Sequence, residues 1–84
     1  MKLDFSDRAK RQYGKLPIRI QIKAEKQFLL LLKTYRHPSL RTKKMSTGVF
    51  EGRIDYHYRF TFTVEGEIIL LLTIAPHDEG LGKK

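Results

Sequence analysis

The spacing of hydrophobic residues changes from a helical period in the first half of the chain to a strand period in the second. Apolar residues recur every three or four positions in the first half, at Ile20, Ala24, Phe28, Leu31 and Tyr35. This spacing predicts a helix with one apolar face. From residue 58 to 64, aromatic and apolar residues alternate with polar ones, which predicts a strand with one buried face.

Local signals set the limits of the helices. Residues 3–5 alternate and predict a short first strand. Ser6 is a suitable N-cap for a first helix, which Gly14 ends. Pro17 suits the first turn of a second helix, and His37-Pro38 ends it near residue 35 because the residue before a proline avoids the helical conformation. Residues 18–23 alternate as a strand would, but the strong helix formers at 23–27 favour a helix.

Three further strands are predicted at residues 49–55, 58–64 and 67–75. A two-residue hairpin turn at Glu65-Gly66 joins the last two, and the continuous Ile/Leu run of the final strand predicts burial on both of its faces. The predicted fold class is therefore α+β, with two N-terminal helices packed on one face of a four-stranded, largely antiparallel sheet. The order is β-α-α-β-β-β, in a single domain spanning residues 1–84.

The charge of the chain favours a polyanionic partner. The formal net charge is +8, and the segment from Lys26 to Phe50 contains six Lys or Arg, Lys26 included, but no acid. Nucleic acid, a ribosome or an acidic protein segment would suit this surface, although a merely solvated basic surface is the alternative. With no cysteine, no disulfide or thiolate metal site is expected. No signal region or membrane span is evident, so we expect a cytoplasmic protein that has no membrane contact.

Two arginines and one histidine are the residues best suited to chemistry. Arg53 and Arg59 can each hold two phosphate oxygens, and the alternative is that they pair with Glu51 or Asp55 across strands. His77 can transfer a proton near neutral pH, because imidazole titrates near ~6.5. The alternative is a histidine that merely ends a strand.

Other polar residues would support RNA binding. Asp78 could orient the imidazole of the preceding histidine. Lys43 and Lys44, expected in a loop before the sheet, could contact phosphates together with Arg41. Tyr56 could stack on a base, whereas Phe60 and Phe62 are expected in the core. The three histidines, at 37, 57 and 77, lack metal-ligand spacing, so no metal or other cofactor is expected.

Taken together, several short motifs resemble the RelE/ParE superfamily of toxins from type II toxin–antitoxin systems. They are His37-Pro38-Ser39-Leu40, Lys43-Lys44, Arg53-Ile54 with Tyr58-Arg59-Phe60, and Ile74-Ala75-Pro76-His77-Asp78. The resemblance covers essentially the whole chain. It implies that Arg53 and Arg59 match phosphate-binding arginines and that His77 falls where some members keep a catalytic histidine. The chain departs from many RNA-cleaving members in lacking a tyrosine just beyond that point, and Glu51 lies several positions from the carboxylate base of some members.

The resemblance implies a toxin that cleaves mRNA on the ribosome without a metal. Its partners would be the ribosome, mRNA and a cognate antitoxin lying over the basic surface and the apolar residues 28–32. Another branch of the superfamily inhibits DNA gyrase and cuts nothing, so a non-enzymatic inhibitor acting through the two helices is an alternative. An inactive member that binds only its antitoxin and operator DNA is a third possibility.

Overall fold

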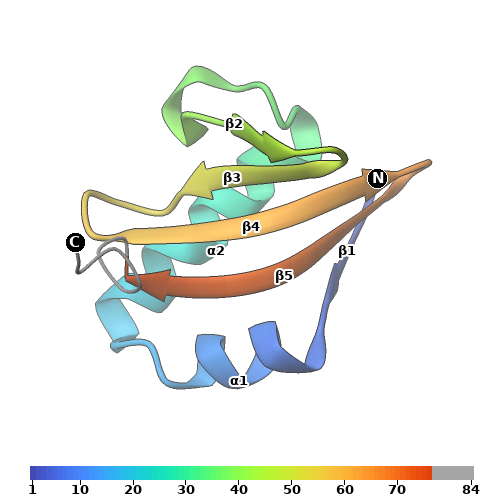
Figure 1. Cartoon of the computed structure of the whole chain (residues 1–84). Coiled ribbons are helices and arrows are strands. Elements are labelled where there is room, and N and C mark those ends of the chain that lie inside the picture. The colour runs from blue at the N-terminus through green and yellow to red at the C-terminus, as the bar shows by residue number, and fades with distance from the viewer. Residues whose placement is uncertain (77–84) are drawn as a thin grey trace.

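A mixed β-sheet forms the centre of the computed structural model, which describes residues 1–76 (Figure 1). Within this range the sheet has five strands: β1 (Lys2–Phe5), β2 (Lys43–Ser46), β3 (Val49–Arg53), β4 (Tyr58–Glu65) and β5 (Ile68–Pro76). Their order across the sheet is β1-β5-β4-β3-β2. β1 runs parallel to β5, and the other neighbours are antiparallel.

The predicted sheet was one strand short, because β2 was expected to be a loop. Lys43 and Lys44 lie in this strand and not in a loop before the sheet. All four residues of β2 are exposed, so the strand has no alternation of apolar and polar residues that could reveal it. Its structure comes from hydrogen bonding to β3, and its two lysines suit an edge strand because charge discourages pairing with another chain.

Two helices, α1 (Asp7–Gly14) and α2 (Ile18–Lys33), confirm the helical predictions. The hydroxyl of Ser6 accepts a hydrogen bond from Ala9 N–H at 3.0 Å and caps α1 as expected. The segment that alternates like a strand, residues 18–23, is helical. α2 ends two residues earlier than predicted, and a short 3-10 helix at Pro38–Leu40 follows.

Side chains of α1 and of its N-cap complete the hydrogen bonding of β5 where β1 ends. β1 pairs with β5 only as far as Leu71. Just beyond that point, the Ser6 hydroxyl donates to the Leu72 carbonyl at 2.9 Å. The Ile74 N–H donates to the Gln12 side-chain oxygen at 2.7 Å. These contacts satisfy backbone groups that a longer β1 would otherwise have paired, and they fix α1 against the sheet.

The core lies between the helices and one face of the sheet. Figure 1 shows α2 crossing behind β3 and β4. The buried apolar members of the core are Ala9, Leu16, Ile20, Ala24, Phe28, Leu31, Leu40, Ile54, Phe60, Phe62, Ile69, Leu71 and Ile74. Phe60 and Phe62 are fully buried, as predicted. The ring of Phe60 meets that of Phe28 edge-on at 5.3 Å and lies directly over Gly52, where a Cβ atom would come within 2.4 Å of it.

Two details of the β4–β5 hairpin differ from the prediction. The turn consists of Gly66 and Glu67, one residue later than expected, and Gly66 adopts a φ of +60°. β5 is not buried on both faces, because Leu70 and Leu72 are only partly covered. No described helix packs on their side of the sheet. The pairing of β5 with β4 is also irregular, because its register shifts between Thr61 and Phe62 of β4. Neither α1 nor α2 is long and apolar enough to cross a membrane.

Candidate functional site

The face of the sheet that the described helices leave uncovered carries two of the charged candidates, Arg53 and Arg59. Arg53 and Arg59 are direct cross-strand partners on β3 and β4. Residues that face each other across two strands share one face of the sheet, and alternation puts their neighbours on the other. Gly52 and Phe60 are paired and Phe60 is buried in the core, so this pair faces the helices. Arg53 and Arg59, the next pair along the two strands, therefore lie together on the open face.

Arg59 is held in place by three groups. Its Nε lies 3.8 Å from Oε1 of Glu51, and its Nη1 donates to the backbone carbonyls of Asp55 and Tyr56, both at 3.4 Å. The side chain is only 15% exposed, and that of Glu51 is 23% exposed. Arg59 thus pairs with a carboxylate, which is one of its two expected roles, and the same contacts hold its guanidinium in place. A fixed cation costs little reorganisation when it meets an anion.

Arg53 brings a second positive charge to the same place. Its Nε is buried and finds no hydrogen-bond partner among residues 1–76. Like charges directly opposite each other on a sheet are destabilising, and among residues 1–76 the one ion pair made by these two guanidinium groups is that of Arg59 with Glu51. An anion bound on the open face would offset this repulsion.

A shallow depression of about 140 Å³ lies beside Arg59 on this face. Glu51, Thr61 and Thr73 contribute polar groups to its lining, and Pro76 lies at its end. The hydroxyls of Thr61 and Thr73 are hydrogen-bonded to each other at 2.6 Å. The depression thus combines a guanidinium, a carboxylate and two hydroxyls on three adjacent strands.

The turn between β3 and β4 is fixed by Asp55. Its Oδ1 accepts hydrogen bonds from the backbone N–H groups of His57 and Tyr58, at 2.9 and 3.0 Å, and Lys23 lies 3.7 Å from its Oδ2. Burial alone would raise the pKa of Asp55, but these hydrogen bonds and Lys23 lower the pKa below its usual value. Tyr56, at the tip of this turn, is 78% exposed, so its ring is accessible for stacking on a base.

The basic residues before the sheet do not form one surface with the two arginines. Lys43 pairs with Glu51 and therefore faces the open side, whereas Lys44 pairs with Phe50 and faces the side of the helices. Arg41 lies in the connection after the 3-10 helix, on the side of Lys44. The structure thus brings Lys43 toward Glu51, Arg53 and Arg59, and separates Lys44 and Arg41 from them.

His77 and Asp78 lie outside the residues that the structure describes. His77 follows directly after Pro76, the last residue of β5, which lines the depression. The roles expected for these two residues therefore stay predictions.

One residue that positions the site was missed by the sequence reasoning. Gln27 is buried on α2, and its Nε2 donates to the backbone carbonyls of Arg53 at 2.8 Å and Ser39 at 3.2 Å. It joins the end of β3 to the 3-10 helix. The available signal was a polar residue directly beside Phe28, between the predicted core positions 24 and 31.

Comparison with known proteins identifies the fold. No family model matches the chain. No curated protein sequence matches it. Among solved structures, it is similar to YafQ from E. coli strain BL21(DE3), with a TM-score of 0.77 and 8% identity over 95% of this chain and 97% of that chain. A chain of the intact E. coli RelBE toxin–antitoxin complex aligns with a TM-score of 0.70 and 20% identity, over 87% and 92% of the two chains. The YoeB/ParE toxin from Agrobacterium tumefaciens gives a TM-score of 0.69 and 19% identity, over 92% and 99%. The chain therefore has the fold of the RelE/ParE toxin superfamily.

Proposed function

We propose that this chain is the toxin of a type II toxin–antitoxin pair and that it cleaves mRNA on the ribosome. The observation that carries the proposal is the pair of adjacent arginines, Arg53 and Arg59, beside the carboxylate of Glu51 on the open face of a RelE/ParE-type sheet. Two guanidinium groups and one carboxylate are suited to a phosphodiester that gains negative charge during cleavage.

The reaction is attack of a ribose 2′-hydroxyl on the adjacent phosphorus. The new bond joins O2′ to phosphorus, and the bond from phosphorus to O5′ breaks, leaving a 2′,3′-cyclic phosphate and a free 5′-hydroxyl. Glu51 accepts the proton from the 2′-hydroxyl, and His77 gives a proton to the departing 5′-oxygen. Arg53 and Arg59 neutralise the charge on the equatorial phosphate oxygens. The nucleophile belongs to the RNA, so this route requires no metal-bound water.

The small size of the depression supports the proposed dependence on the ribosome. The depression measures about 140 Å³, below the roughly 300–1,000 Å³ of sites that enclose a small ligand. A site this shallow leaves most of a nucleotide outside, so the chain needs another body to hold the RNA in a bent geometry. We propose that the ribosome does this, with Lys43 and other surface cations contacting ribosomal RNA.

The antitoxin would cover an apolar groove of about 370 Å³ beside α2. Leu3, Phe5, Phe28, Leu29 and Leu32 contribute to its lining, with Tyr13 and Glu25. Phe28, Leu29 and Leu32 belong to the segment 28–32 for which a docking role was expected. The net charge of +8 favours an acidic amphipathic segment as the occupant. Solved complexes of similar chains with antitoxins, the E. coli RelBE and DinJ-YafQ complexes, support a partner of this kind.

The test is cleavage in a reconstituted translation system, with mRNA ends mapped by primer extension with and without ribosomes. We expect cuts within ribosome-bound codons and a loss of about 10²–10³-fold in single-turnover rate for Arg59→Ala. Arg8→Ala, an exposed arginine on α1 away from the site, is the matched control and is expected to cleave normally. His77→Ala is expected to lose cleavage, with recovery when the substrate carries a leaving group that needs no proton. Intact mRNA at full ribosome occupancy would refute the proposal.

A second candidate function is supported by the outer face of α2. Ile18, Ile22 and Leu29 are 72%, 65% and 64% exposed, and their spacing puts them on one side of the helix. Such a stripe suits docking to a protein, which a non-enzymatic inhibitor of DNA gyrase would require. In a supercoiling assay, inhibition by the wild type that is lost in Ile22→Lys, together with intact mRNA, would favour this function.

A further inference from the structure

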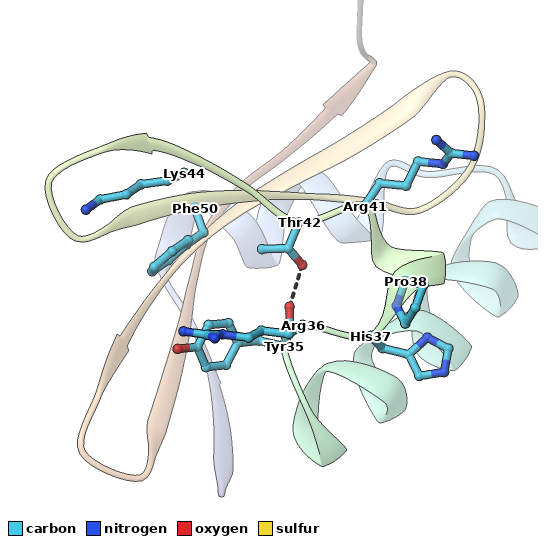
Figure 2. A pocket seen from close by; sticks show the side chains of 8 residues that line it. All are labelled: Tyr35, Arg36, His37, Pro38, Arg41, Thr42, Lys44 and Phe50. Carbon is cyan, nitrogen blue, oxygen red and sulfur yellow. Dashed lines mark hydrogen bonds between the residues drawn. The ribbon is translucent and has the colours of Figure 1, made fainter.

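A second cavity, of about 380 Å³, lies on the other side of β2 from the open-face site. The connection that follows α2, residues 35–42, forms one wall, and Lys44 of β2 and Phe50 of β3 form the other. Figure 2 shows Tyr35 and Arg36 below, with Lys44 and Phe50 above them. Its volume falls in the range of roughly 300–1,000 Å³ typical of small-ligand sites, unlike the depression on the open face.

The cavity combines aromatic rings with unpaired cations. The rings of Tyr35 and Phe50 lie 5.6 Å apart and are only partly buried, and the guanidinium of Arg36 lies 5.6 Å from the Tyr35 ring centre. The two ion pairs found among residues 1–76 involve neither Arg36 nor Lys44, and no acidic residue lines the cavity. Both cations are therefore available for an anionic ligand.

The connection that forms one wall is held rigidly. The Thr42 hydroxyl donates to the Tyr35 carbonyl and closes the connection on itself (Figure 2). Leu40 is fully buried and anchors it in the core. Arg41 adopts a left-handed conformation with a φ of 49°, which is uncommon for a residue other than glycine, and its N–H donates to the Pro38 carbonyl at 3.1 Å. Strained backbone held by its surroundings is frequent at binding sites.

We propose that this cavity binds one unpaired nucleotide of RNA. The base stacks against the exposed parts of Tyr35 and Phe50, and its phosphate lies between Arg36 and Lys44. Stacking on aromatic rings beside cations is the usual way in which proteins hold single-stranded nucleic acid. An acidic protein segment would satisfy the two cations but offers carboxylates, which have no aromatic face to stack on the rings. The proposal rests on the proposed function only in taking RNA as the polymer.

The position of this cavity gives the chain two RNA contacts on opposite sides of β2. Lys43 belongs to the open face, and its neighbour Lys44 belongs to the cavity, because successive side chains of a strand point to opposite faces. One RNA strand passing around this sheet edge would contact both the open face and the cavity. A ribosomal RNA loop entering the cavity while mRNA lies on the open face would also occupy both sites. The shared ligand chemistry is an unpaired nucleotide.

The test uses a fluorescently labelled RNA hexanucleotide with 2′-O-methyl groups, which cannot be cleaved by attack of the 2′-oxygen, and measures binding by anisotropy at several salt concentrations. Arg36→Ala and Lys44→Ala replace exposed side chains and leave the core intact. Each is expected to weaken binding at least threefold and to reduce the slope of log affinity against log salt by about 0.7. Tyr35→Leu is expected to weaken binding about tenfold without changing that slope. Lys10→Ala, an exposed lysine on α1, removes the same charge and is expected to change affinity by less than twofold.

The same variants tested on vacant ribosomes identify the source of the nucleotide. A loss on the hexanucleotide alone indicates the mRNA strand, and a loss on ribosomes indicates a ribosomal RNA loop; both support the cavity. Unchanged binding of all three variants to both RNAs overturns the proposal. So does displacement of the RNA by hexaglutamate at equal concentration, which would assign the cavity to an acidic protein segment. Because the hexanucleotide cannot be cut, these outcomes are independent of whether Arg59→Ala abolishes cleavage.

Discussion

Replacing Gly52 by alanine tests how closely β3 approaches the core. A Cβ atom at this position would lie 2.4, 2.8 and 2.9 Å from three carbon atoms of the Phe60 ring. Separations this short require the ring or the strand to move. Phe60 is fully buried and its ring also contacts those of Phe28 and Phe62, at centroid distances of 5.3 and 5.7 Å, so the ring has little room to shift.

The expected cost follows from two opposing effects. Overpacking a core costs about 1–3 kcal/mol, whereas replacing glycine by alanine gains about 0.4–1 kcal/mol by restricting the unfolded chain. We therefore expect Gly52→Ala to lower the free energy of unfolding by roughly 1–2 kcal/mol and Tm by roughly 5–15 °C, given about 4–8 °C per kcal/mol for a domain of this size. Thermal unfolding followed by circular dichroism measures this change.

Gly14 provides a matched control. It lies at the end of α1, and a Cβ there meets no atom within 4 Å. Gly14→Ala is expected to leave Tm unchanged or raise it by a few degrees. In a Phe60→Leu background, which removes the ring, Gly52→Ala is expected to cost less by about 0.5 kcal/mol or more. An unchanged Tm for Gly52→Ala, or the same loss in both backgrounds, would refute the steric reasoning.

Three further predictions concern side-chain contacts. Because the pKa of folded Asp55 is lowered, its carboxylate stabilises the fold above the unfolded pKa, and this stabilisation is lost as pH falls through the folded pKa. As pH falls from about 5 to about 2, the urea midpoint should therefore fall less steeply in Asp55→Asn than in the wild type. Burial, and then the hydrogen bond to Glu25, raise the pKa of Tyr13 from 10.0 to about 12. The neutral Tyr13 side chain therefore stabilises the fold below the unfolded pKa, and this stabilisation is lost as pH rises through the folded pKa. One tyrosine should ionise late in an ultraviolet titration, and Tyr13→Phe should remove that step. Four normal tyrosine titrations in the wild type would contradict this. Gln27→Leu leaves two carbonyls without their donor and should lower the free energy of unfolding by about 1–3 kcal/mol in urea, whereas an unchanged midpoint would show that water replaces the amide.

Both helices could be predicted from the sequence because their signals are local. The Ser6 cap, the glycine that ends α1 and the apolar period of α2 each depend on residues within a few turns of one another. The pattern of aromatic residues on β4 likewise predicted the burial of Phe60 and Phe62. The same local reasoning missed β2, whose residues carry no apolar pattern and become a strand only by pairing with β3.

The sequence suggested the residue types of the candidate site but not their arrangement. Arginines at 53 and 59 and a carboxylate at 51 could be selected from the sequence, because few side chains bind phosphate or accept a proton. Their adjacency could not be predicted with equal certainty, since a shift of one residue between two strands moves every side chain to the other face. The cavity between Tyr35 and Phe50 was missed entirely because its walls come from segments with no common pattern.

The class of fold, the positions of both helices, the aromatic core of β4 and the basic character of the surface follow from the amino-acid sequence alone. These depend on periodicity, capping and composition, which act over short distances along the chain. The tertiary structure alone decided that Arg53 lies beside Arg59, that Lys43 and Lys44 belong to different surfaces and that Gln27 joins β3 to the 3-10 helix. Such relations are set by strand register and by packing between distant segments, which the order of residues specifies only through the whole fold.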